Sequence, residues 1–217
     1  MAWPFIVGLA VLLGFVLLLV QIRVLEYAYE RIGIKRRWVF ALLILSLLGS
    51  AINIPIAALP PEQVVSGRAV DFFGMRYIVP DVQDLPGTVL AINLGGALIP
   101  TALSIYLWIR RRLGGLALVA IAIVTVAVNF MARPIPGVGI AVPSFWPPII
   151  AAVTAVLLSR RSAPALAYIA GTLGTLVGAD VLNLPYLQGL GAPVASIGGA
   201  GTFDSVFLTG ILAVLLA

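Results

Sequence analysis

The residues best suited to chemistry are two aspartates, Asp180 and Asp204, in the last two hydrophobic segments of the chain, 163–184 and 200–217. An ionised carboxyl inside a membrane costs about 3 kcal/mol or more, so such residues are functional candidates. If both segments span a bilayer, they are antiparallel and are expected to be neighbours. Each aspartate then lies one turn from the outer helix end, about 6 Å deep at about 1.5 Å per residue. The two carboxyls are therefore expected to meet at one depth.

A pair of carboxyls at one depth can share a proton. One carboxyl then acts as the base that activates water, and the other acts as the acid that protonates the leaving group. A turn before Asp204 is predicted to support this pair, because its backbone N–H groups and the helix dipole favour a nearby negative charge. Thr202 is predicted to cap the helix that follows. The turn residues are Gly198, Gly199, Gly201 and Thr202.

Further polar side chains are expected at the same depth, near the outer ends of the other spans. A single intramembrane asparagine usually forms a hydrogen bond between helices, so each of these alone is more simply a packing contact. An arginine in the next outer loop is the candidate partner if the aspartates serve only the packing of the bundle. This supporting layer comprises Asn53, Asn93, Asn129, Asn183 and Arg133.

The composition places these residues in a membrane protein. Hydrophobic residues make up 62% of the 217 residues and charged residues only 10%, too few to cover the surface of a soluble domain. The chain has no cysteine and no histidine, which excludes thiol catalysis, imidazole bases and the usual zinc ligands. We therefore expect one transmembrane domain, 1–217, which uses no metal and no other cofactor.

Apolar runs of sufficient length predict an all-α polytopic bundle of about seven spans. Proline residues at the start of the fifth run suit the first turn of a helix. The expected spans are 3–25, 38–58, 88–109, 115–131, 146–159, 163–184 and 200–217.

The distribution of arginine and lysine sets the expected topology. Basic residues concentrate in the first, third and fifth loops, at 31–37, 110–112 and 160–161. Because positive loops stay in the cytoplasm, the N-terminus is predicted outside and the C-terminus inside. The net charge of +5 thus reflects topology and does not indicate binding to nucleic acid.

Three outer segments are unusual. The longest, 60–87, is predicted to be an extracytoplasmic loop whose "FFGMRYIVP" stretch forms a short hairpin or strand. The segments 134–148 and 187–201 are rich in glycine or proline and almost uncharged. We expect both to lie in the membrane interface or to enter the bundle, where protein groups satisfy their backbone.

Small residues form a stripe along 163–184 that predicts close helix packing. They recur at three- and four-residue intervals, a spacing that lets another backbone approach. At about 100° per residue, Asp180 points away from the stripe, toward a different neighbour. The stripe comprises Ala167, Gly171, Gly174 and Gly178.

Two strings, "AYIAGTLGTLVGADVLNL" and "SIGGAGTFDSVFLTGILAVLL", resemble an uncharacterised family of bacterial and archaeal membrane proteins, domain of unknown function 1614. The string "RPIPGVGIAVPSFWPP" resembles that family too. The resemblance covers most of the chain and implies a multi-pass protein of the prokaryotic cytoplasmic membrane. It implies no particular activity.

A more distant likeness is to the intramembrane aspartyl proteases presenilin, signal peptide peptidase and the prepilin peptidases. Those families place one aspartate in each of two spans, the second in a G-x-G-D motif. The likeness assigns Asp180 and Asp204 as the catalytic pair. Here the second motif reads Gly201-Thr202-Phe203-Asp204, so Phe203 stands where the family has its second glycine.

Three functions remain open on these residues. The first is an intramembrane hydrolase that cleaves a transmembrane peptide with the aspartate pair. The second is a small transporter or channel that binds a proton or a hard cation through the same oxygen atoms. The third is a membrane structural or assembly protein whose aspartates pair with Arg133.

Overall fold

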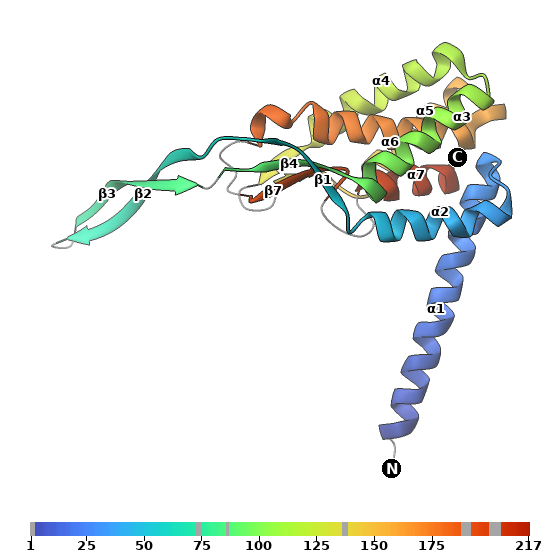
Figure 1. Ribbon diagram of the computed structural model, residues 1–217, viewed down its shortest axis with the longest axis horizontal. Coiled ribbons are helices and arrows are strands. Elements are labelled where there is room, and N and C mark those ends of the chain that lie inside the picture. Colours follow the sequence, from blue (N-terminus) through green and yellow to red (C-terminus); the bar gives the residue numbers. More distant parts are fainter. Residues whose placement is uncertain (1–2, 73–74, 86, 136–138, 188–191, 200–204) are drawn as a thin grey trace.

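The computed structural model describes residues 3–72, 75–85, 87–135, 139–187, 192–199 and 205–217. Helices dominate this part of the chain, as the hydropathy predicted. Figure 1 shows most of the helices gathered in one bundle, while the first extends away from it. The seven α-helices of the described residues are α1 (Trp3–Ile32), α2 (Arg36–Gly49), α3 (Ile99–Arg110), α4 (Gly114–Met131), α5 (Trp146–Leu158), α6 (Ala163–Thr175) and α7 (Ser205–Leu216).

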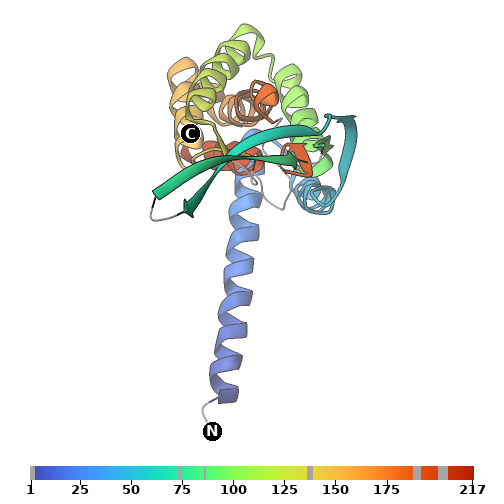
Figure 2. The same ribbon diagram turned by 90° about the vertical axis from the view of Figure 1, so that its left-hand side faces the viewer.

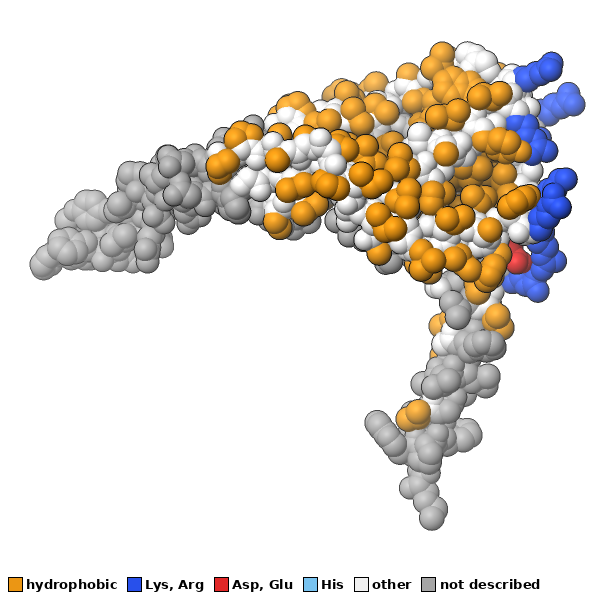
Figure 3. Space-filling view, viewed as in Figure 1, with side chains coloured by type: hydrophobic (Ala, Val, Ile, Leu, Met, Phe, Trp, Pro, Cys, Tyr) orange, Lys and Arg blue, Asp and Glu red, His pale blue; other side chains and the backbone are white. Residues whose placement is uncertain are grey.

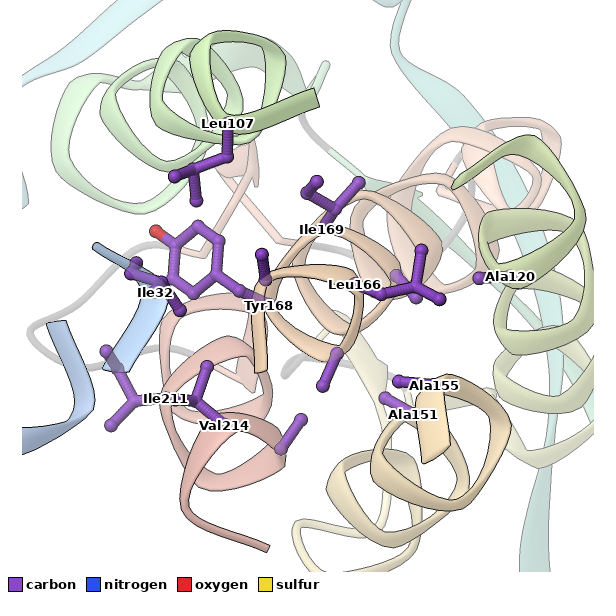
Figure 4. Packing of buried hydrophobic residues seen from close by; sticks show 14 of the residues in the cluster. Ile32, Leu107, Ala120, Ala151, Ala155, Leu166, Tyr168, Ile169, Ile211 and Val214 are labelled. Carbon is purple, nitrogen blue, oxygen red and sulfur yellow. The ribbon is translucent and has the colours of Figure 1, made fainter. Parts of the chain in front are cut away.

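Helix α6 lies at the centre of the bundle. It contacts α3, α4, α5 and α7, and nearly all its residues are buried. Figure 4 shows Leu166, Tyr168 and Ile169 of α6 pointing toward different neighbours. Because apolar side chains cover its whole circumference, α6 is a helix that neighbours enclose on all sides.

Helix α1 joins the bundle only through its C-terminal turns. Ala28, Tyr29 and Ile32 are buried, and the Tyr29 ring lies 6.4 Å from the ring of Tyr168 in α6. The preceding turns of α1 extend away from the other helices in both views (Figures 1 and 2). The N-terminal end of the chain is thus far from the core.

Strands interrupt the helices, which corrects the all-α expectation. A three-stranded sheet has the order β1 (Asn53–Ala58), β4 (Val89–Asn93), β7 (Val194–Ile197), with β1 antiparallel and β7 parallel to β4. Two antiparallel pairs complete the strands, and one of them extends away from the bundle (Figure 1). They are β2 (Glu62–Phe72) with β3 (Met75–Leu85) and β5 (Arg133–Ile135) with β6 (Gly139–Ala141).

The second and third expected spans are only partly helical. Residues 53–58 of the predicted span 38–58 form β1, and the start of the span 88–109 forms β4 and the π-helix η1 (Leu94–Leu98). An apolar run of this length does not distinguish strand from helix. Pro55 would break a helix but fits an edge strand, and the β1–β4 register shifts between Pro55 and Ala57.

The expectation of seven spans is not supported by the described helices. Among the described residues, two helical segments are long and apolar enough to cross a membrane, Gly114–Met131 and Arg160–Tyr186. The second includes α6, the 3-10 turns η2 (Arg160–Ser162) and η4 (Leu184–Tyr186), and the π-helix η3 (Leu176–Val181). Helices α5 and α7 have 13 and 12 residues. They are shorter than the roughly 20 residues that cross a bilayer.

The surface of the bundle is apolar along its sides and basic at one end. Figure 3 shows hydrophobic side chains over the visible face and lysine and arginine side chains together at one end. Large side chains remain exposed on several helices, including Phe130, Leu157 and Ile109. Exposed apolar area of this extent marks a surface that contacts lipid or another protein.

The small-residue stripe of α6 packs against two helices. A Cβ at Gly171 would lie 3.1 Å from the Thr209 carbonyl oxygen of α7, and one at Gly178 would lie 2.5 Å from the Thr125 carbonyl oxygen of α4. The expectation of one closely packed neighbour is therefore wrong, because Gly171 meets α7 whereas Gly174 and Gly178 meet α4. Both backbones approach because no side chain stands between them.

This packing predicts that Gly178→Ala destabilises the bundle. The added methyl would overlap the Thr125 carbonyl, and overpacking of this kind costs about 1–3 kcal/mol. Thermal unfolding in detergent measures the effect as a lower Tm. Gly115→Ala is the matched control, because a Cβ at Gly115 meets nothing within 4 Å. An equal loss in both variants would contradict the packing argument.

Candidate functional site

Asp180 lies on η3, where the helix that contains α6 changes from α- to π-helical hydrogen bonding. Its side chain is half-buried, and its Oδ2 accepts a hydrogen bond of 2.7 Å from the backbone N–H of Gly198. Gly198 directly follows β7, so the bond joins two segments eighteen residues apart. It fixes the orientation of the carboxyl. Local π-helical turns are frequent at functional sites.

A cavity of about 190 Å³ lies beside this carboxyl, between η3, β6, β7 and the first residue of α7. Its polar lining includes Asp180 together with Ser196 and Ser205. The remaining side chains of the lining are mostly aliphatic. The aliphatic lining comprises Leu90, Ile140, Leu184, Leu187, Ala192, Val194, Ala195 and Ile197.

Asp204, Gly201 and Thr202 lie outside the described residues. The residues that bracket this segment are described, and both line the cavity: Gly199 precedes it and Ser205 follows it. The distance between the two predicted catalytic carboxyls is therefore not part of the described geometry. The described residues on either side of this segment thus lie at the cavity that Asp180 lines.

Gly198 allows the closest backbone contact around the site. It has φ +83°, and a Cβ there would lie 2.6 Å from the backbone nitrogen of Ala97. A Cβ at Gly96 would lie 2.0 Å from the Gly198 carbonyl oxygen. The turn after β7 thus lies directly against η1, which places the Gly198 N–H toward Asp180. Gly199 also has φ +83°, a conformation that glycine adopts without strain.

Asn93 is the centre of a second polar group. It is fully buried, its Nδ2 donates to the Ser50 carbonyl at 2.7 Å and to Asn53 Oδ1 at 3.0 Å, and its Oδ1 accepts from the Gly96 N–H at 2.7 Å. Asn53 Oδ1 also accepts from Ser196 Oγ at 2.6 Å. These bonds join the end of α2, the three strands and η1. Asn53 and Asn93, two of the four asparagines in the predicted polar layer, therefore meet on strands and not on helices.

The other members of the predicted polar layer have different positions. Asn183 is buried, and its Nδ2 donates to the carbonyl oxygens of Gly178 and Ala179, each at 2.9 Å. It thus provides hydrogen-bond donors to carbonyls near the C-terminal end of its own helix. Asn129 is half-buried on α4, and Arg133 is exposed on β5. The pairing of Arg133 with an aspartate stays a prediction.

Two serines of the site were not predicted. Ser196 lies in a segment expected to be a loop, and it becomes a site residue because β7 pairs in parallel with β4. Ser205 begins α7 directly after the segment that contains Asp204. The only sequence signal for Ser205 is its position next to the predicted catalytic Asp204. Ser196 has no local signal, because its place depends on the pairing of β7 with β4, about a hundred positions earlier in the chain.

The donor set is poor in metal ligands. Across the part of the chain that the structure describes, no three or more aspartate, glutamate, histidine or cysteine side chains come close enough to hold a metal ion. The arrangement brings together one oriented carboxyl, two hydroxyls and an aliphatic wall. Such a set can bind a polar group in an apolar setting and can exchange a proton with it.

A family model with the description "Protein of unknown function (DUF1614)" matches residues 47–216. The match contains Asp180, Ser196, Ser205 and the three strands of the sheet. It leaves out α1 and most of α2. No curated protein and no solved structure matches the chain.

The hydrogen bonds of Asn93 predict that Asn93→Ala destabilises the protein. The change leaves the buried Gly96 N–H and the Ser50 carbonyl without their partner, at about 1–3 kcal/mol for each unsatisfied group. Thermal unfolding in detergent measures the loss. Asn129→Ala is the control on α4 and is expected to shift the Tm little. If both substitutions lowered the Tm equally, the Asn93 network would not be the structural centre described above.

Proposed function

We propose that this chain, which belongs to the DUF1614 family of proteins of unknown function, is a multi-pass membrane protein that hydrolyses peptide bonds with Asp180 and Asp204. The proposed activity is that of an intramembrane aspartyl protease-like hydrolase. The proposed substrate is a transmembrane peptide.

One observation carries this proposal. Asp180 lines a cavity that Gly199 and Ser205 also line, and these two residues bracket the segment 200–204, which contains Asp204. The described residues on both sides of the segment with the second carboxyl therefore line the cavity that holds the first. This arrangement supports a shared site for two carboxyls that the sequence separates by 24 positions.

The chemistry follows from two carboxyls that hold one proton. The ionised carboxyl removes a proton from water, and the water oxygen attacks the peptide carbonyl carbon. The protonated carboxyl gives its proton to the amide nitrogen as the C–N bond breaks, which yields a carboxylic acid and an amine. The Gly198 N–H fixes the orientation of Asp180 for this exchange.

The sheet offers a place for an extended substrate. Strand β7 is at the edge of the order β1-β4-β7, and four of its residues line the cavity. An extended peptide can pair with an edge strand through main-chain hydrogen bonds. A peptide placed beside β7 would pass Asp180. The segment "FFGMRYIVP" was predicted to form a short hairpin or strand. Its described residues lie in the β2–β3 pair, not beside the cavity.

A carrier is the second candidate, and one observation favours it. The helix that contains α6 ends in a π-helical turn and 3-10 turns before α7 begins, and the oxygen atoms of Asp180, Ser196 and Ser205 lie at this break. Discontinuous helices with polar groups at the break form ion sites in transporters. The activity assays below distinguish the two candidates.

The topology proposed for this protein has the N-terminus outside and the C-terminus inside a prokaryotic cytoplasmic membrane. Arg31 Nη1 donates to the Val214 carbonyl at 3.0 Å, so the end of α7 lies at the basic end of the bundle (Figure 3). Basic ends face the cytoplasm. A reporter fused after Ala217 should therefore be active only on the cytoplasmic side. Activity on the other side would overturn this orientation.

Asp180→Asn and Asp204→Asn are each expected to leave the protein folded and to lower hydrolysis by roughly 100- to 10,000-fold, because each removes one member of the acid–base pair. The assay uses purified protein and a single-span model peptide in detergent. Hydrolysis by the unsubstituted protein should show a bell-shaped pH dependence whose two limbs belong to the pair. Glu30→Gln removes an exposed carboxyl of α1 outside the cavity and is the matched control.

The same proteins, reconstituted in vesicles, are tested for proton and cation flux. Cleavage that both aspartate variants lose and Glu30→Gln retains supports the hydrolase. Flux without cleavage, lost in the same two variants, would replace the hydrolase by a carrier. Full activity of the Asp180→Asn, Asp204→Asn double variant would overturn the functional role of this pair.

A further inference from the structure

A second pocket lies at the basic end of the bundle, and it shares no lining residue with the Asp180 cavity. It has a volume of about 560 Å³ and opens between the N-terminal end of α2 and the C-terminal end of α3. Pockets of this size hold small-molecule ligands. The lining comprises Ile34, Lys35, Arg37, Trp38, Leu42, Leu103, Tyr106 and Arg110.

The charge of this pocket is entirely positive. Lys35, Arg37 and Arg110 line it, and no aspartate or glutamate is among its lining residues. Arg36 instead lies 3.5 Å from Glu26 in an ion pair. Glu26 also pairs with Arg23 at 3.2 Å, so this acid is already shared between two arginines. Within the described part of the chain, Lys35, Arg37 and Arg110 have no carboxylate at salt-bridge distance, which favours an anionic ligand.

Aromatic rings hold two of the three cations in place. The guanidinium of Arg37 lies 5.5 Å from the centre of the Trp38 ring, and that of Arg110 lies 5.5 Å from the centre of the Tyr106 ring. Arg110 also donates a hydrogen bond to the Tyr106 hydroxyl. Contacts of this kind reduce the freedom of the arginine side chains. The positions of the charges are thus set before a ligand arrives.

The turn between α1 and α2 fixes the mouth of the pocket. Arg111 of the α3–α4 turn donates to the Ile32 carbonyl at 2.8 Å. Gly33 follows Ile32 and has φ +93°. The chain therefore turns at Gly33, beside the guanidinium of Arg111. A hydrogen bond therefore joins the α1–α2 turn to the turn after α3 at the rim of the pocket.

The interior of the pocket is apolar. Ile34 and Leu103 are buried and Leu42 is half-buried. Below the rim, α2 and α3 continue with exposed aliphatic side chains, among them Leu45 and Ile105. The pocket thus presents cations at the basic end and an apolar wall along the bundle, where Figure 3 shows basic and hydrophobic surfaces meeting.

We infer that this pocket binds an anionic phospholipid. The headgroup phosphate contacts Lys35, Arg37 and Arg110, and an acyl chain lies along the apolar faces of α2 and α3. The ligand class follows from the combination of positive charge and apolar wall at the end of a helical bundle, where basic pockets bind acidic headgroups. A free phosphate would use only the cations. This inference does not depend on the chemistry of the Asp180 cavity.

The test measures thermal unfolding of the full chain in detergent as a function of added dioleoylphosphatidylglycerol. The lipid is expected to raise the Tm, because a ligand that binds only the folded state stabilises it. Dioleoylphosphatidylcholine at the same concentration should raise it less. The double substitution Arg37→Gln, Arg110→Gln should weaken the apparent affinity roughly 30-fold, which equals about 2 kcal/mol at about 1 kcal/mol per cation.

The matched control is Arg160→Gln, Arg161→Gln, which removes the same charge outside the pocket lining. It should retain the affinity of the unsubstituted protein. If the pocket variant shows no cooperative unfolding without lipid, Lys35→Gln alone replaces it, with an expected loss of about fivefold.

Three results would overturn the inference. The first is an equal loss in the pocket and control variants, which would indicate a diffuse attraction between the basic end and any acidic surface. The second is an equal effect of the two lipids. The third is a rise in Tm with inorganic phosphate that matches the rise with phosphatidylglycerol, which would identify a phosphate site without a role for the acyl chain.

Discussion

The requirement that each buried backbone N–H and C=O find a partner governs this structure, because the interior of the bundle offers no water to bond them. The helices meet it internally, but the chain leaves helical geometry at several places, among them after α2, before η1 and after η3. Asn93 supplies partners to the end of α2 and the start of η1. Asn183 supplies partners to the carbonyls at the end of η3. The three-stranded sheet supplies backbone hydrogen bonds to the extended segments between these points.

The candidate site follows from these interruptions. Strand β7 reaches β4 only because the chain leaves the helix after η3 and returns before α7. That return places Gly198 against η1 and its N–H on Asp180. The break in the helices therefore supplies both the hydrogen bond that orients Asp180 and the cavity beside it.

The two ends of the bundle differ in chemistry. One end holds the sheet, the Asp180 cavity and hydrogen-bonded amide side chains. The other end gathers lysine and arginine side chains and holds the second pocket (Figure 3). Apolar side chains cover the length between them, and α6 passes through the centre of that length. A molecule with this order of surfaces is suited to a bilayer whose two faces carry different charge.

The apolar runs 115–131, 146–159 and 163–184 predicted helices from the sequence alone, and these regions form α4, α5 and the helix that contains α6. The sequence also indicated close packing around Gly178, because small residues at helical spacing let another backbone approach. It singled out Asp180, since a carboxyl in an apolar helix is rare. Asp204 rests on the same reasoning and stays a prediction, because it lies outside the described residues.

Only the tertiary structure decided where the chain is extended. Residues 53–58, 89–93 and 194–197 are as apolar as a helix, and they become strands because each finds its partner far away in the chain. The hydrogen bond from Gly198 to Asp180 and the meeting of Asn53 with Ser196 depend on that pairing. The local sequence shows which segments are apolar. The pairing of β4 with β7, about a hundred positions apart, depends instead on the packing of the whole bundle.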